Sequence, residues 1–441
     1  MPSRKSTASR PDPRGKLAPG LRLPHEQVVA SQRERLLSAA TDLAAEQGAQ
    51  DTSIHDLASR AGISRAAFYE VFANKNDCLL YAYDTHLARA EAQIITAYRD
   101  PNLHGIDALR AAIAALLEWV IAWPSAAQLC TAEIVSAGPD AIERRNQCKA
   151  AGEAALARAL EQIYPQQSNA ILMRGILAGA EQLIHSHASS GQVHLLAGTE
   201  DDLLSWILTY DRSPDHGRDR ASPQISGPPT EDQSPAEAID TVKGSHDPVI
   251  QRKRISTAVL QVAAAKGYRA TNFRDIAHTA NISLSTFYKH FGSKREAFLA
   301  AFDECAQEIS AATNGMLDPD GTKPEAVRDA IAALLGYLAD HPAIARISLI
   351  DIYSADKPGI ERVDRLLACY SSIPILDGKR RLVAPPNICT LVTGGIAGIL
   401  HQHIAADRCE KLPGLTAPLT YFVLAPLVGS ERAFGIATEQ R

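Results

Sequence analysis

The chain has 441 residues and a mass of 47.4 kDa, more than one hydrophobic core usually holds, which indicates roughly two to four domains. Hydrophobic residues make up 46% and aromatic residues only 5%, with Ala and Leu abundant, so an all-α protein is favoured over a sheet. The net charge of −5 excludes a uniformly basic nucleic-acid binder, although an average hides local charge.

Several classes of protein are excluded by missing motifs. The seven cysteines lie far apart with no CxxC pair, so we expect reduced thiols, no metal site and no cofactor. No apolar run approaches the roughly 18 residues of a membrane span, and the first thirty residues lack an apolar stretch, so we expect a cytoplasmic protein with no membrane contact. No nucleophile elbow, P-loop, dinucleotide fingerprint or paired-carboxylate motif occurs, so we expect no catalytic residues and no enzyme.

The sequence repeats itself. When it is shifted by 219 positions, residues 33–84 align without a gap to residues 252–303, with 19 of 52 positions identical. Weaker similarity continues beyond this block, and the pattern G-x-x-A-G recurs at residues 175–179 and 394–398. Residues 211–247, rich in Pro, Ser, Gly and Asp, separate the copies and have the composition of a flexible linker. A duplicated unit of about 200 residues is therefore predicted.

Each copy begins with the signals of three short helices. In the first copy, an apolar stripe predicts a helix over residues 33–47 that Gly48 ends, and Ser53 with Asp56 predicts an N-cap box for the next helix. Asn272 and Asp275 provide the same signal in the second copy. A turn at residues 61–64 or 280–283 then leads to a helix of about two turns, where paired phenylalanines face inward.

This frame resembles the TetR family, most closely in the second copy, where residues 280–298 read ANISLSTFYKHFGSKREAF. The resemblance implies that the third helix of each head enters the major groove while nearby hydroxyl and cationic groups hold phosphates. The DNA-binding residues that follow from it are Thr52, Arg65, Ala66, Ala67, Tyr69, Lys75, Thr271, Leu284, Ser285, Thr286, Tyr288, Lys289, His290 and Lys294.

The two heads differ in charge. Residues 33–84 hold five Lys/Arg and eight Asp/Glu, a net charge of −3, whereas residues 252–303 hold nine and three, a net charge of +6. Glu70 also stands where the second copy has Lys289. The second head should therefore be the stronger DNA anchor. Residues 1–30, expected to be a disordered basic arm, either supply the missing charge to the first head or do nothing specific.

The remainder of each unit consists of amphipathic helices that predict a bundled core. The resemblance implies a small-molecule pocket in this core, with the last two helices forming a dimer interface. Residues that either line such a pocket or belong to the ordinary core are Trp119, Trp123, Met173, His185, Tyr337, Tyr353 and His401. The small residues of G-x-x-A-G either let the two copies pair, through about residues 168–212 and 387–429, or serve packing within each unit.

These features predict an all-α chain of two TetR-like units, each a three-helix helix-turn-helix head followed by a helical ligand-binding and dimerisation bundle. The expected domains are residues 1–30 (arm), 31–84 (first head), 85–210 (first bundle), 211–247 (linker), 248–303 (second head) and 304–441 (second bundle).

The expected function is ligand-responsive transcriptional regulation, most simply repression, by an intramolecular pseudo-dimer on an asymmetric double-stranded operator, with an unidentified small-molecule effector. In the alternative, only the second unit binds DNA, and the first is a protein-interaction or dimerisation module. Further pairing of whole chains is left open.

Overall fold

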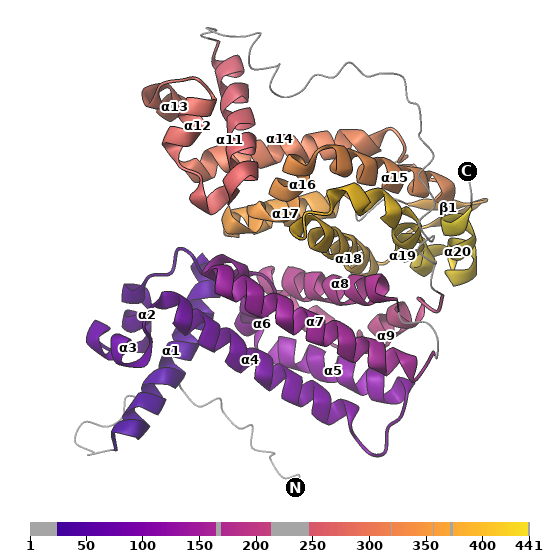
Figure 1. Ribbon diagram of the computed structural model, residues 1–441. Coiled ribbons are helices and arrows are strands. Elements are labelled where there is room, and N and C mark those ends of the chain that lie inside the picture. The colour runs from indigo at the N-terminus through magenta and orange to yellow at the C-terminus, as the bar shows by residue number, and fades with distance from the viewer. Residues whose placement is uncertain are drawn as a thin grey trace.

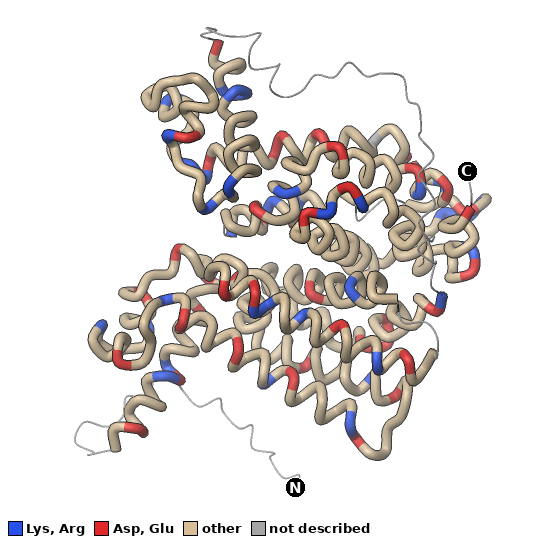
Figure 2. The backbone as a smooth tube through the Cα atoms, viewed as in Figure 1, with Lys and Arg blue, Asp and Glu red and all other residues tan. Residues whose placement is uncertain are grey.

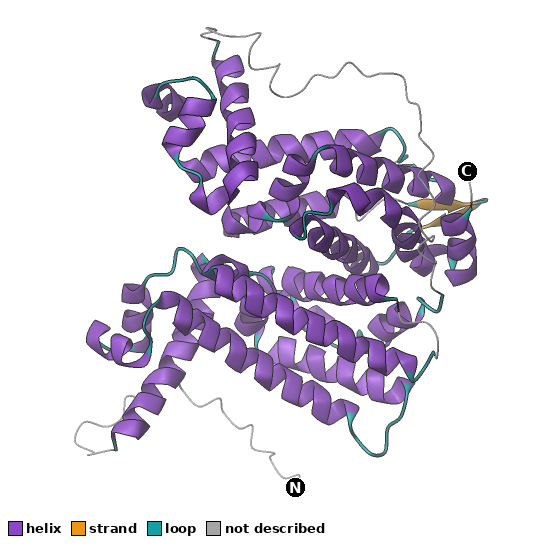
Figure 3. Ribbon diagram, in the orientation of Figure 1, coloured by secondary structure: helices purple, strands orange, loops and turns teal. Residues whose placement is uncertain are grey.

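The computed structural model describes residues 24–164, 169–212, 247–318, 320–355, 357–370 and 374–439. Most of the predicted basic arm (residues 1–23) and of the linker (residues 213–246) lies outside the described residues. Within the described part, the protein is almost entirely helical, which confirms the predicted all-α class (Figure 3).

The chain forms two helical units that lie one above the other in Figure 1. The first consists of α1 (His25–Gln47), α2 (Ile54–Ala61), α3 (Arg65–Val71), α4 (Lys75–Tyr98), α5 (Ile106–Ala122), α6 (Pro124–Thr131), η1 (Glu133–Ala137), α7 (Pro139–Glu161), α8 (Ala170–Ser189), η2 (Val193–Leu196) and α9 (Glu200–Leu208). The second consists of α11 (Pro248–Ala270), α12 (Phe273–Thr279), α13 (Leu284–His290), α14 (Lys294–Asn314), α15 (Pro324–Asp340), α16 (Pro342–Leu349), η3 (Asp351–Ala355), α17 (Lys357–Tyr370), β1 (Ile375–Asp377), β2 (Arg380–Leu382), α18 (Pro386–Ala405), η4 (Cys409–Leu415), α19 (Thr416–Val428) and α20 (Ser430–Thr438).

Two local features differ from the sequence-based expectation. Helix α1 begins at His25, eight residues before Arg33, so the last part of the expected disordered arm is helical. In the second unit, a small antiparallel hairpin pairs Ile375 with Leu382 and Asp377 with Arg380. The Asp377-Gly378 step, with Gly378 at φ 62°, provides the left-handed residue that such a tight turn requires.

The hydrophobic core has three parts. Each head has its own buried cluster, centred on Phe68 in the first and Phe287 in the second, which are both fully buried. The third cluster runs without interruption through both bundles and contains Trp206 of the first unit together with Phe422 of the second. The bundles therefore pack as one body, whereas the heads have separate cores.

The contact between α8 and α18 is the most extensive between any two described elements. It depends on glycine, because a Cβ added at Gly179 would lie 2.3 Å from the carbonyl oxygen of Leu391, and one added at Gly398 would lie 2.2 Å from the Cβ of Ala178. Nearby, the Tyr210 ring stacks on Phe422 with centroids 4.9 Å apart, and its hydroxyl donates to the Phe422 carbonyl oxygen at 3.0 Å. The G-x-x-A-G segments thus lie between the units.

Helix α18 and the segment Cys409–Val428 are long and apolar enough to cross a membrane by length and composition alone. Each is about half buried inside the protein. Since α18 packs against α8 on one side and against its own bundle on the other, its apolar composition is accounted for by these contacts.

Candidate nucleic-acid interface

The second helix of each head begins at the predicted cap. The Ser53 hydroxyl accepts from the Asp56 backbone N–H at 3.2 Å, and the Asp56 carboxylate accepts from the Ser53 backbone N–H at 3.0 Å, which completes a capping box. In the second head, the Asn272 side chain accepts from the backbone N–H groups of Arg274 and Asp275. Both predicted helix starts are confirmed.

The turn before the recognition helix has the predicted left-handed backbone, at Gly62 (φ 65°) and Asn281 (φ 49°). The side chains of Ser64 and Ser283 then cap α3 and α13. An arginine from the first helix holds each turn, because Arg35 donates to the Ala61 carbonyl oxygen at 3.1 Å and Arg254 to that of Ala280 at 2.5 Å. This role of the repeated R-x-R motif was missed by the sequence analysis.

The inner faces of α3 and α13 pack on their heads, and the outer faces are open to solvent. Phe68, Phe72, Phe287 and Phe291 are buried, as predicted. Tyr69 and Tyr288 are 51% and 53% exposed and stand on their helices in the same place. The other exposed side chains of the outer faces are Arg65, Ala66, Glu70, Leu284, Ser285 and Lys289, while Ala67 and Thr286 are partly covered.

Two of the residues expected to contact DNA are buried in this structure. Thr52 and Thr271 are 1% and 3% exposed, and their hydroxyls donate to the carbonyl oxygens of Gly48 and Gly267, four residues earlier. Both threonines therefore stabilise the loop after the first helix. The exposed side chains at this corner are those of the next residues, Ser53 and Asn272.

The other side chains that were expected to contact phosphates point partly inward, towards the protein. Lys75 donates to the Gln50 carbonyl oxygen at 2.7 Å, and Lys294 donates to those of Tyr268 and Thr271. Burial lowers the pKa of the Lys294 ammonium. The His290 ring pairs with the Gln251 side chain at 2.9 Å.

Most cations of the second head are also engaged within the chain. Lys253 pairs with Glu304, Lys266 pairs with Asp275, and Arg252 lies over the Phe291 ring. In the described part of this head, Arg274 and Lys289 are exposed cations for which the structure shows no such partner. Arg65 is the corresponding exposed cation on the first recognition helix. In Figure 2, Lys and Arg (blue) predominate on the second head, whereas Lys, Arg, Asp and Glu are mixed on the first head.

The heads also touch the opposite unit. Arg269 of the second head donates to the carbonyl oxygens of Val135 and Ser136 in η1, the latter at 2.7 Å. Arg295 lies 3.1 Å from the carboxylate of Asp51 in the loop between α1 and α2. These contacts connect the second head to the first unit.

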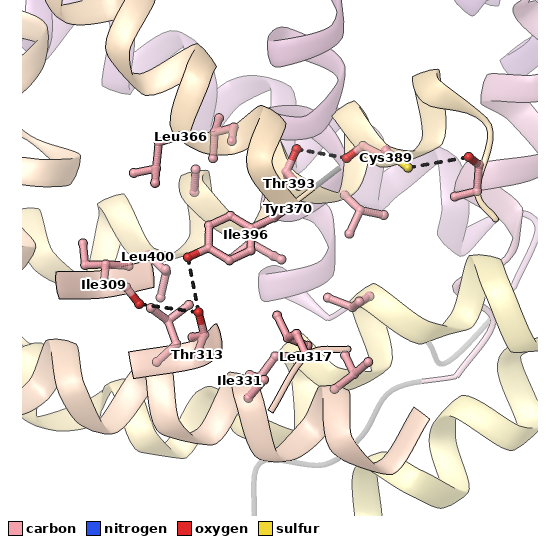
Figure 4. A pocket seen from close by; sticks show the side chains of 18 of the residues that line it. Ile309, Thr313, Leu317, Ile331, Leu366, Tyr370, Cys389, Thr393, Ile396 and Leu400 are labelled. Atoms are coloured by element: carbon pink, nitrogen blue, oxygen red, sulfur yellow. Dashed lines mark hydrogen bonds between the residues drawn. The ribbon is translucent and has the colours of Figure 1, made fainter. Parts of the chain in front are cut away.

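The second bundle contains an apolar cavity of about 210 Å³ (Figure 4). Its few polar groups include the Thr313 and Tyr370 hydroxyls, which lie 3.3 Å apart at one end, and Thr393, which donates to the Cys389 carbonyl oxygen. The Ser348 hydroxyl, 1% exposed, has no hydrogen-bond partner among the described residues. Among the residues that the structure describes, no charged side chain lines this cavity.

The candidate pocket residues do not line it. Tyr337 stacks on His341 and donates to Glu308, and Trp119 and Met173 lie buried in the core of the first bundle, with Trp123 packed against it. His185, Tyr353 and His401 line a separate cavity between the units. The residues that do line the apolar cavity, such as Leu334, Ile388 and Ile396, have the composition of ordinary core, which gave the sequence analysis no signal.

Comparison with known proteins bears on both heads. The model of the family described as "Bacterial regulatory proteins, tetR family" matches residues 36–82 and 255–301. The transcriptional repressor KstR of Mycolicibacterium smegmatis is 26% identical over 116 residues, 26% of this chain and 57% of KstR. The putative mycofactocin biosynthesis regulator MftR of Mycobacterium tuberculosis is 33% identical over 97 residues, 21% of this chain and 48% of MftR.

These matches span about half the length of those two relatives. Among solved structures, a TetR-like transcriptional regulator from Rhodococcus covers 42% of this chain and 98% of its own, with 20% identity and a TM-score of 0.37.

Proposed function

Because this chain belongs to the TetR family and carries the family's DNA-binding head twice, we propose that it is a sequence-specific, ligand-responsive transcriptional regulator that acts as a repressor. The observation that carries the proposal is the repeated exposed face. On each recognition helix, a half-exposed tyrosine and a cation stand outward while the phenylalanines hold the helix to its head. Such a face contributes little to folding but suits a major groove flanked by phosphates.

We propose further that the two units replace the two subunits of a homodimer. The tight packing of α8 on α18 and the contacts of Arg269 and Arg295 with the first unit support this arrangement. Both recognition helices lie at the end of the molecule opposite α9 and α20 (Figure 1). Since residues 65–67 read Arg-Ala-Ala and residues 284–286 read Leu-Ser-Thr, the two half-sites of the operator should differ in sequence.

The apolar cavity of the second bundle is the proposed effector site. Its lining favours a mostly apolar ligand with a polar group that meets Thr313, Tyr370 or Ser348. Binding there would change the position of the second head, because Ser348 belongs to α16, which packs on α11 and α18. As a regulator of bacterial type, the protein would act in the cytoplasm.

A second candidate function rests on Glu70. This carboxylate is exposed on the outer face of the first recognition helix, where it would oppose a phosphate backbone. In this alternative, the second unit alone binds DNA, two chains assemble on each operator, and the first unit serves as an interaction module.

Selection of operators from random duplexes with the full-length protein separates the two. The proposal predicts one chain on an asymmetric site whose half-sites lie about 34–36 Å apart. It also predicts that Arg65→Ala relaxes one half-site and Ser285→Ala the other. Two chains on a palindrome, insensitive to Arg65→Ala, would support the alternative. A protein that selects no duplex would overturn both.

A further inference from the structure

A second cavity, of about 340 Å³, lies between the two units. Its walls come from α7 and α8 of the first unit and from η3, α17 and α18 of the second. Unlike the apolar cavity, it has many charged and polar side chains in its lining, among them Arg145, Lys149, Glu153, Arg174, Glu181 and Asp364. It is large enough for a small organic molecule.

The charges form three groups. Arg174 makes two hydrogen bonds to Glu153, at 3.0 and 2.8 Å. Asp364 of the second unit accepts from the Gln182 side chain at 2.8 Å and lies 3.3 Å from the His185 ring. The first of these groups is balanced, whereas in the second the Asp364 carboxylate faces a glutamine and a histidine.

The third group is not balanced. Arg145 and Lys149 both pair with one carboxylate oxygen of Glu181, at 3.2 and 2.5 Å. One positive charge is therefore in excess at this corner. Burial, and then Arg145 and Lys149, lower the pKa of His401 to about 3, as expected for a ring next to excess positive charge.

Two polar atoms of the lining residues lack a partner among the described residues. They are Nδ1 of His185, whose side chain is only 8% exposed, and Nε of Arg145, whose side chain is 16% exposed. A buried polar atom without a partner costs about 1–3 kcal/mol, which a ligand with oxygen acceptors or hydroxyl groups could recover.

The fold does not require these charges. In the repeat, the positions of Arg145, Lys149, Glu181 and His185 are occupied in the second unit by Val363, Leu367, Leu400 and Ile404. The second unit packs with apolar side chains at these positions, and buried ion pairs are seldom more stabilising than apolar contacts of similar size. The charged set on the first unit is therefore a difference between the copies that the fold itself does not demand.

We propose that this cavity binds a small oxyanion, bearing carboxylate or phosphate groups, at the corner formed by Arg145 and Lys149. The site is distinct from the effector cavity of the second bundle and does not depend on DNA binding. Since both units supply its walls, an occupant would stabilise their contact. One site per chain is expected, because the counterpart positions in the second unit are apolar.

The test uses the full-length protein without DNA. Calorimetric titration and thermal unfolding are followed with succinate, citrate and inorganic phosphate, each against sodium chloride of equal ionic strength and against the neutral succinamide. At least one oxyanion should bind with one site per chain and raise the unfolding temperature, while succinamide should not. The identity of the anion that binds shows whether the site prefers carboxylate or phosphate groups. No binding by any of the three would overturn the proposal.

A variant that removes the excess charge supplies the second test. Lys149→Leu installs the side chain that the second unit carries at this position and leaves Arg145 paired with Glu181, so it should weaken binding at least tenfold. The matched control, Arg110→Leu, removes an exposed cation of the same unit and should bind as the parent does. Equal binding by both variants would overturn the proposal. If the first variant fails to fold, Arg145→Lys, which keeps the charge but loses the planar donors, should still weaken binding.

Discussion

Reversing the charge of Glu70 tests whether the first recognition helix faces DNA. Glu70→Lys places on α3 the cation that α13 carries as Lys289, at an exposed position with no packing to disturb. Each added phosphate contact steepens the dependence of log K on log salt by about 0.9. When the salt concentration is raised fourfold, one additional phosphate contact therefore increases the fold-loss of affinity by a further factor of roughly 3.5. Removal of the repelling carboxylate adds to the gain at low salt.

The assay is fluorescence anisotropy of a labelled duplex over a salt series, with an operator from the selection or a duplex of arbitrary sequence. The control is Glu91→Lys, which makes the same change of net charge at an exposed position of α4 behind the head. Lys289→Glu should flatten the slope by a similar amount. If Glu70→Lys and Glu91→Lys shift the slope equally, the first head does not present α3 to DNA.

Three further predictions concern the bundles. Gly179→Ala should lower the free energy of unfolding by about 1–3 kcal/mol and weaken operator binding, whereas Gly336→Ala, which has open space around it, should be neutral or slightly stabilising in denaturant melts. Ile396→Trp should fill the apolar cavity and abolish the response to an apolar effector while leaving operator affinity intact; a retained response would place the effector elsewhere. Burial lowers the pKa of His86 from 6.5 to about 4, so the unfolded chain binds the proton more readily than the folded chain does. Up to about 3 kcal/mol of the free energy of unfolding should therefore be lost as the pH falls from 6.5 towards 4. His86→Gln should reduce this pH dependence in urea melts.

The heads could be predicted in detail because their signals are local. The Ser53 and Asn272 caps, the Gly62 and Asn281 turns and the inward phenylalanines each lie within a few residues of the feature that they determine. The early start of α1 at His25 escaped notice because its first two turns are mostly polar and lie partly exposed, so no apolar stripe marked them. The hairpin at Asp377-Gly378 had a turn signal, but its strands are only three residues long.

The linings of the two cavities could not be predicted, because their walls come from segments far apart in the sequence. On α7, Arg145 and Lys149 have the spacing of an ordinary solvated face, and only the approach of Glu181 and His401 turns them into a buried set. The burial of the two threonines was not predicted for a related reason. Thr52 and Thr271 stand where the family resemblance implies phosphate contacts, but their hydroxyls are used by the backbone four residues earlier.

Fusion of two units into one chain explains why their differences could arise. In a symmetric homodimer every substitution occurs twice, so a cation placed beside the interface is matched by a second cation across the symmetry axis. Here Arg145 pairs with Glu181 on the wall that the first unit supplies, while its counterpart Val363 lines the same cavity from the second unit. A tandem chain can therefore contain a polar site without symmetry and two recognition helices with different exposed residues. A symmetric homodimer cannot. The proposed asymmetric operator and the proposed interface oxyanion site would follow from the same physical cause.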